Sequence, residues 1–208
     1  PRLAERDRMT VARAFSAALV GLEARPVVVE AALGAGLPGL TVVGLGDVAV
    51  RESRERIRSA LRQIGLPLPG RNVVVNLAPA DLPKSGTGFD LAIALAILAA
   101  SGDVPAAGLE GTTLAGELAL DGFVRGVPGI LSIAECARAE GRSRLVVAPE
   151  NAAAAAAVPG VVVFPAPHLG AVVAHVAGRE LLAPYEAPPW EDPVTGEEPD
   201  LSDVRGQA

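Results

Sequence analysis

The sequence is poor in the residues that most often build metal sites and disulfides. Its 208 residues include one cysteine and two histidines. The single cysteine, Cys136, excludes a disulfide framework and a cysteine metal cluster, and it favours a cytoplasmic location. Two histidines are too few for a histidine-based metal site without several carboxylates, so we interpret His168 and His175 as structural residues and expect no metal site.

Long apolar runs and aromatic residues are also scarce. No apolar run approaches the length of a membrane span, and no signal peptide opens the sequence, so we expect no contact with a membrane. Only six residues are aromatic, although half of the chain is apolar. The core must therefore be built from valine, leucine, isoleucine and alanine.

The negative charge is confined to one end of the chain. From residue 183 onward there are seven acids, one arginine and five prolines, whereas residues 1–182 carry 17 acidic and 17 basic residues. Such a segment cannot bury enough apolar surface to fold alone, so we expect residues 183–208 to be an acidic, proline-rich linker. Residues 1–8 are polar and charged and form a predicted extension. One domain is expected over residues 9–182.

Hydrophobic periodicity predicts a succession of strands and helices. We expect strands at residues 11–20, 26–33, 40–45, 72–77, 145–147 and 161–164, and extended segments at 112–120 and 123–127 around the hairpin dipeptide Asp121-Gly122. We expect helices at residues 47–64, 91–100, 129–140 and 168–176, and one or two helical turns at 150–156. Strands that alternate with helices after an initial meander predict a mixed sheet in an α+β fold with a two-layer α/β arrangement.

The most informative stretch is residues 71–101, in which a buried strand leads through a glycine-rich turn into a helix that is apolar on every face. Asp90 is the predicted N-cap of this helix. We call the turn and its cap the candidate loop, which comprises Lys84, Ser85, Gly86, Thr87, Gly88 and Asp90. Loops between a strand and a helix often carry binding or catalytic groups.

The candidate loop does not match the usual motifs. In a P-loop the lysine follows the glycines, but here Lys84 precedes them. No Gly-x-Gly-x-x-Gly opens the helix, and Asp81 occupies the serine position of a Ser-x-x-Lys motif. Two interpretations therefore stay open, namely a working site and a tight connection that carries a solvated lysine.

The predicted helix at residues 47–64 has two stripes. Its apolar stripe comprises Val50, Ile57, Leu61 and Ile64. A neighbouring stripe, the arginine strip, comprises Arg51, Arg54, Arg58 and Arg62. We expect Glu52 and Arg56 to form an i,i+4 ion pair on the far side. The arginine strip is either a solvated face or an electropositive surface for nucleic acid or an acidic partner.

Several motifs resemble the ComM/YifB family of magnesium-chelatase-like bacterial AAA+ ATPases. They are GLPGLTVVGL at residues 36–45, NLAPADLPK at 76–84, FDL at 89–91, GELALDG at 116–122 and PENA at 149–152. The resemblance implies that the chain is the N-terminal part of a longer protein, with residues 203–207 at the entry to an AAA+ module. It also implies DNA as a partner, a hexameric ring, and helicase activity in branch migration during natural transformation. ATP and Mg²⁺ would bind in the AAA+ module, and we expect no cofactor site in this chain.

In this family the region resembles the proteolytic domain of Lon, which has a ribosomal protein S5 domain 2-like fold. Lon-type peptidases use a serine in Pro-Lys-Asp-Gly-Pro-Ser-Ala-Gly and a lysine in a later Gly-Gly-Leu-Lys turn. In this chain Gly88 stands at the serine position and Leu131 at the lysine position, so both halves of the dyad are missing.

We therefore expect a non-catalytic accessory domain that serves ring assembly, DNA contact or partner docking. Two alternatives stay open. One is a Lon-like peptidase that uses Ser85 or Thr87 with Lys84, and the other is a free-standing nucleic-acid-binding domain that uses the arginine strip. Nothing in the sequence supplies a tetrapyrrole site.

Overall fold

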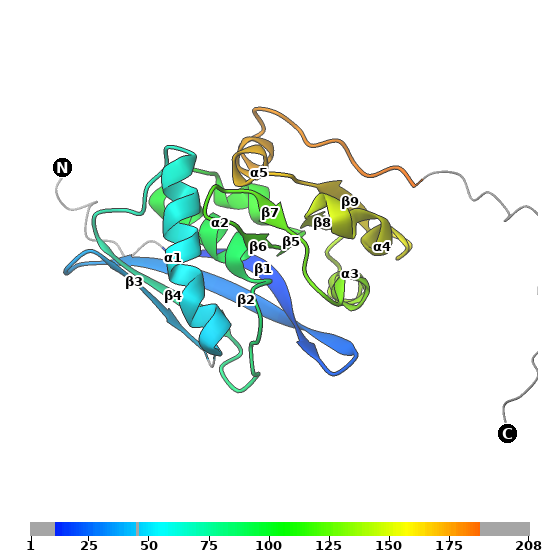
Figure 1. Cartoon of the computed structure of the whole chain (residues 1–208), viewed down its shortest axis with the longest axis horizontal. Helices are drawn as coiled ribbons and strands as arrows, with labels where there is room; N and C mark the ends of the chain where they lie inside the picture. Colours follow the sequence, from blue (N-terminus) through cyan, green and yellow to red (C-terminus); the bar gives the residue numbers. More distant parts are fainter. Residues whose placement is uncertain (1–10, 45, 188–208) are drawn as a thin grey trace, which may run out of the picture.

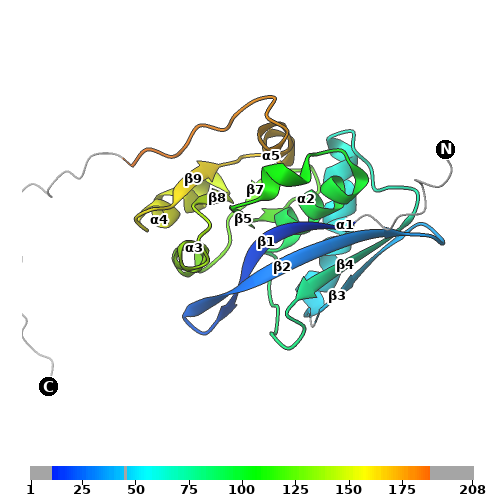
Figure 2. The same cartoon turned by 180° about the vertical axis from the view of Figure 1, so that it is seen from behind.

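A seven-stranded mixed sheet forms the centre of the protein, and helices pack on both of its faces (Figures 1 and 2). The computed structural model describes residues 11–44 and 46–187. The predicted extension at residues 1–8 and the linker beyond residue 187 lie outside this part of the chain. The boundaries predicted for the domain stay a prediction.

The strands of the central sheet are β1 (Val11–Val20), β2 (Glu23–Gly34), β3 (Gly39–Val43), β4 (Asn72–Ala78), β5 (Thr112–Ala115), β8 (Arg144–Val147) and β9 (Val162–Pro165). A separate two-stranded ribbon comprises β6 (Glu117–Leu118) and β7 (Val124–Arg125). The helices are α1 (Val48–Gln63), α2 (Asp90–Ser101), α3 (Ile130–Ala139), α4 (Ala152–Ala156) and α5 (Leu169–Val176), with 3₁₀ turns at Ala106–Leu109 and Pro149–Asn151.

The sheet has the strand order β3-β4-β2-β1-β5-β8-β9. Strand β2 runs antiparallel to both of its neighbours, β1 and β4, and every other pair in the sheet is parallel. The predicted initial meander is confirmed for β1 and β2 only, because β4 lies between β2 and β3 and runs parallel to β3. The parallel pairs join strands that are connected through helices. This arrangement confirms the predicted mixed α/β fold class. The closer resemblance to ribosomal protein S5 and Lon stays a prediction.

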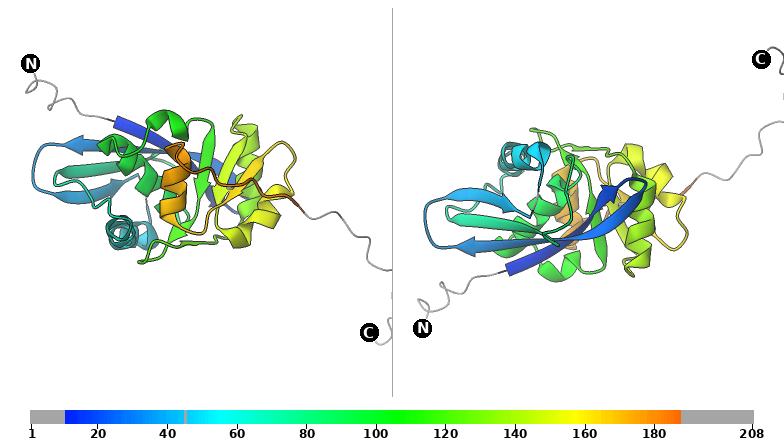
Figure 3. Two further views of the ribbon diagram at one scale, coloured as in Figure 1. Left: turned by 90° about the horizontal axis from the view of Figure 1, so that it is seen from above. Right: turned by 90° about the horizontal axis from the view of Figure 1, so that it is seen from below.

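The larger core lies on one face of the sheet, under helices α1, α2 and α5. Every residue of α2 from Asp90 to Ala100 is buried, as its all-round apolar sequence predicts. The second core lies on the opposite face, where α3 and α4 cover β5, β8 and β9. Seen from below, α1 is viewed almost end-on beside strands β1 to β4, and none of the described helices covers the outer face of β3 and β4 (Figure 3, right).

The chain beyond α5 packs back onto the sheet. The backbone N–H of Leu182 donates to Nδ1 of His175 (3.1 Å), and that of Tyr185 donates to the carbonyl of Val163 in β9 (2.7 Å). The Tyr185 side chain packs against the second core. The first residues of the predicted linker therefore contact the domain.

Candidate functional site: the loop before helix α2 and the arginine strip on helix α1

Asp47 holds the candidate loop against the start of helix α1. Its Oδ1 accepts a hydrogen bond from the N–H of Val50 (2.9 Å), which caps the helix, and its Oδ2 accepts one from the N–H of Gly86 (3.1 Å). The Asp47 N–H donates to the carbonyl of Lys84 (3.0 Å). The sequence places an aspartate before a helix, which is the signal for the cap, but the link to a loop some 40 residues away could not be predicted locally.

Lys84 is buried, with 1% of its surface exposed. Its ammonium donates to the carbonyl oxygen of Pro79. Burial lowers the pKa of Lys84 below its ordinary value, and the nearby charge of Asp81 opposes this shift. The interpretation of Lys84 as a solvated lysine is therefore wrong, because the loop folds its side chain inward onto a backbone acceptor.

The hydroxyl groups of the candidate loop have no base beside them. Ser85 is exposed, whereas its neighbour Lys84 is buried, and no hydrogen bond joins Lys84 Nζ to the hydroxyl of Ser85 or Thr87 within the described residues. Next to the loop is a hollow of about 50 Å³. It is lined by Ala17, Leu19, Ser85, Gly86, Thr87, Gly88, Phe89, Val127, Pro128 and Ile133. None of these side chains can take up or release a proton near neutral pH.

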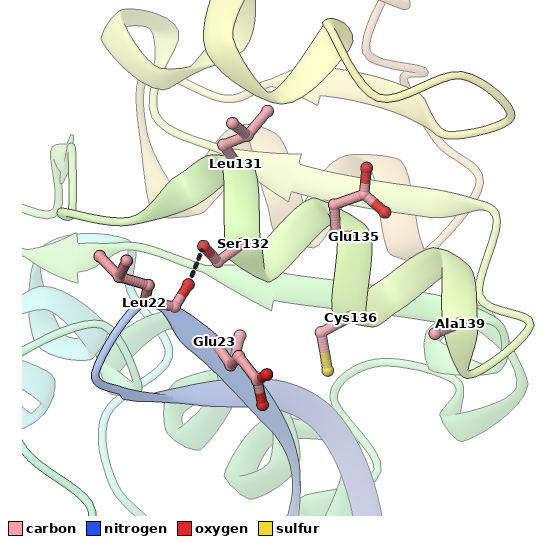
Figure 4. A pocket seen from close by; sticks show the side chains of 8 residues that line it. Leu22, Glu23, Leu131, Ser132, Glu135, Cys136 and Ala139 are labelled. Atoms are coloured by element: carbon pink, nitrogen blue, oxygen red, sulfur yellow. Dashed lines mark hydrogen bonds between the residues drawn. The ribbon is translucent and has the colours of Figure 1, made fainter.

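The two positions that correspond to the Lon dyad lie on neighbouring elements but carry no reactive group. A Cβ atom at Gly88 would lie 3.7 Å from Cγ1 of Val127, in the turn that leads into α3. Leu131 is in the first turn of α3, half exposed, and lines a different pocket, between α3 and the turn of the β1–β2 hairpin (Figure 4). In that pocket the Ser132 hydroxyl donates to the carbonyl of Leu22 (2.7 Å), and burial raises the pKa of the Cys136 thiol.

Asp90 is not the N-cap of helix α2. The cap residue is Phe89, which makes no side-chain capping bond, and Asp90 is the first residue of the helix. Its carboxylate is 1% exposed and accepts two hydrogen bonds from Arg56, from Nε at 2.6 Å and from Nη2 at 3.1 Å. It also accepts one from the N–H of Leu118 (3.2 Å). The carboxylate is thus occupied by a bidentate ion pair that crosses from α2 to α1.

The same pair overturns the prediction for Arg56. Arg56 does not form a solvated pair with Glu52, because it lies on the flank of α1 that faces the start of α2. Its Nη2 also donates to the carbonyl of Ala49 (3.2 Å). Burial raises the pKa of Asp90 and Arg56 opposes that shift, while the hydrogen bond to Asp90 raises the pKa of Arg56.

The arginine strip lies on the opposite flank of α1 and is open to solvent. Its members Arg51, Arg54, Arg58 and Arg62 are all exposed, as predicted. Arg54 Nε donates to the carbonyl of Arg51 (3.0 Å), and Arg58 approaches Glu55 only to 4.0 Å. The apolar stripe is buried as predicted, with Ile64 partly buried at its end. The face is therefore strongly positive, and its charges are barely neutralised by the protein.

Comparison with known proteins places this geometry in a family. Residues 29–151, which include the candidate loop, the arginine strip and the Arg56–Asp90 pair, match the family described as subunit ChlI of Mg-chelatase. The chain belongs to this family. It is 43% identical to YifB of Salmonella typhimurium over 199 residues and 43% identical to YifB of Escherichia coli over 200 residues. It is 41% identical over 174 residues to the competence protein ComM of Haemophilus influenzae.

These alignments cover 96%, 96% and 84% of this chain, which confirms the resemblance predicted from the sequence. They cover 39%, 39% and 34% of the three relatives. The chain therefore spans about two fifths or less of the length of the relatives that it matches.

The residues of this ChlI-family domain do not fit Mg²⁺ and ATP. Within residues 11–44 and 46–187, no three histidine, cysteine or acidic side chains come together as metal ligands. The lysine of the glycine-rich loop is bonded to Pro79 and is not directed at the amides that follow it. That ATP and Mg²⁺ bind in another module of the whole protein stays a prediction.

Both histidines have structural contacts. His168 caps α5, with Nδ1 accepting from the N–H of Gly170 (3.1 Å) and Nε2 lying 3.0 Å from the carbonyl of Asp121. The His175 ring packs against Phe164 at a tilt of 43°, with ring centroids 4.8 Å apart, and burial lowers the pKa of His175. Among the described helices, none is long and apolar enough to cross a membrane. The cytoplasmic location stays a prediction.

Proposed function

We propose that this chain is a non-catalytic accessory domain of a magnesium-chelatase-type AAA+ ATPase that acts on DNA. The hollow beside the candidate loop carries the proposal, because hydrolysis of a peptide bond needs an activated nucleophile and none of the lining side chains is a base. Lys84 could serve as a base only after leaving the Pro79 carbonyl and the interior. The loop therefore serves as a connection from β4 to α2 that Asp47 ties to the start of α1.

The proposed action on DNA is inferred from the relatives. One protein that is 41% identical over 174 residues is a competence protein, and competence is the capacity to take up DNA. In the whole protein, the ATPase module would bind ATP and Mg²⁺ and move DNA as a helicase in branch migration. The present domain would contribute to ring assembly, DNA contact or partner docking.

The test is a chimeric ComM in which this chain replaces the matching region of the Haemophilus influenzae protein. We expect the chimera to restore transformation by linear DNA in a strain that lacks ComM, at a frequency within a few fold of the native protein. Ser85→Ala with Thr87→Ala should leave that frequency unchanged, because no hydroxyl group acts in catalysis. Failure of a stably expressed chimera to restore transformation would contradict the proposal.

A further inference from the structure

A groove runs along the exposed flank of helix α1. One wall is formed by Arg58 and Arg62, and the other by the prolines and Leu68 of the segment 67–70 that connects α1 to β4. Pro38 and Gly39, at the start of β3, also line the groove. Its volume is about 290 Å³. This groove is distinct from the hollow beside the candidate loop, with which it shares no lining residue.

The groove is positive and has no acid in its walls. Arg58 and Arg62 are its only charged lining residues. Arg58 has a single long approach to Glu55, at 4.0 Å, and no ion pair to Arg62 occurs among the described residues. Because they are four positions apart on a helix, the two side chains start about 5–6 Å from each other. With Arg51 and Arg54 the positive flank extends over roughly 17 Å of helix.

The second wall is apolar and poor in hydrogen-bond donors. Pro67 and Pro69 have no backbone N–H, and Leu68 adds a partly buried apolar side chain. Such a wall can contact the flat faces of sugars and bases, but it cannot read the donors and acceptors on base edges. The combination of guanidinium groups on one side and apolar rings on the other suits a strand with phosphates along one edge and unstacked bases along the other.

We propose that the groove between Arg58, Arg62 and the segment 67–70 binds single-stranded DNA without sequence preference. Successive phosphates contact the two guanidinium groups, and the sugars and bases pack against the prolines. A duplex turns its bases inward and offers this groove only phosphates, so it binds more weakly. The proposal rests on the proposed role in DNA processing and assigns that role to one face of the domain.

The acidic C-terminal segment opposes DNA binding through its charge. Residues 183–208 carry a net charge of −6, which is opposite in sign to the arginine strip. Neutralising acids in this segment should therefore raise the affinity for DNA, because it reduces the repulsion between the protein and the phosphates.

The experiment measures binding of fluorescein-labelled oligo(dT) to the full chain by anisotropy between 20 and 200 mM salt. A second protein carries Glu191→Gln, Asp192→Asn, Glu197→Gln and Glu198→Gln. In each of these two proteins, the double variant Arg58→Gln/Arg62→Gln is compared with the double variant Arg25→Gln/Arg138→Gln. The control pair removes the same charge from exposed arginines on the β1–β2 hairpin and α3.

We expect the Arg58/Arg62 variant to bind at least tenfold more weakly at the lowest salt. The slope of log K against log salt should fall by about 1.4, since each lost phosphate contact removes about 0.7 on a single strand. The control variant should stay within twofold of its parent. Equal losses of affinity in the two double variants would overturn the proposal that this groove binds single-stranded DNA. Binding of a duplex as tight as that of oligo(dT) would also overturn it. The ComM chimera could still restore transformation in that case, so the two proposals fail separately.

Discussion

Arg56 stands among the charged residues of α1, whereas Asp90 opens the apolar helix α2, and together they form the most buried ion pair among the described residues. Arg56 is one of five arginines on helix α1, and the other four face solvent. A buried pair of this kind contributes little when it replaces an apolar contact, but it becomes costly when one partner is removed. Lys84 follows the same rule with a backbone carbonyl as its partner.

Arg56→Met should destabilise the protein by about 3–5 kcal/mol, because it leaves the Asp90 carboxylate buried and unpaired. Without Arg56 the pKa of Asp90 should rise further above 3.8, so the folded variant binds a proton that the unfolded chain releases. The deficit should therefore shrink as the pH falls toward 4. Urea unfolding at pH 7 and pH 4.5 measures both effects.

Arg54→Met is the matched control and should stay within about 0.5 kcal/mol of the parent, since Arg54 is exposed. The double variant Arg56→Met with Asp90→Asn should recover part of the loss. Equal effects of the Arg54 and Arg56 substitutions would show that the buried pair is not formed.

Lys84→Met should cost about 1–3 kcal/mol, because it keeps most of the volume of the side chain but leaves the Pro79 carbonyl without its partner. Ser85→Ala, at the exposed neighbouring position, should have almost no effect. Denaturant unfolding of the two variants checks this. A Lys84→Met protein as stable as the parent would indicate a solvated lysine after all.

At the scale of elements, the two flanks of α1 have different environments. One flank joins α2 through Arg56, and the other presents the arginine strip beside the segment 67–70. At the far edge of the sheet, α5 and β9 are tied to the chain that follows them through His175 and Tyr185. These contacts make the residues just after α5 a part of the folded domain.

Burial and the nearby Arg144 hold the pKa of His175 below its ordinary value of 6.5. As the pH falls below 6.5 the unfolded chain takes up a proton on this ring before the folded protein does, so stability should decrease with falling pH in that window. His175→Asn should remove this component. Melting temperatures of parent and variant should be measured between pH 7.5 and 5. The same decrease with falling pH in both proteins would contradict this prediction.

Tyr185→Ala should lower stability by roughly 1–2 kcal/mol, less than for a fully buried aromatic residue because Tyr185 is only partly buried. Glu186→Ala, at the next position, is exposed and should have no measurable effect. Thermal unfolding of both variants separates a docked segment from an independent linker, for which the two substitutions would be equivalent.

At the scale of the whole molecule, local sequence patterns predicted the strands and helices because their periodicity reflects burial. The all-apolar α2 and the two-stripe α1 are the clearest cases. The pattern could not predict where Arg56, Asp90 and Lys84 point, since their partners are 34 residues away in the first two cases and set by the loop fold in the third. The sequence singled out the candidate loop, but the environment of its residues follows from tertiary contacts alone.

The central claim is that this domain works by binding and not by cleaving peptide bonds. The most direct test is incubation of the intact chain with unfolded casein and a panel of fluorogenic peptides. We predict no cleavage above the buffer control, because the hollow beside the loop has no base and Lys84 is bonded to Pro79. Cleavage that disappears in the Ser85→Ala, Thr87→Ala or Lys84→Ala protein would contradict the claim.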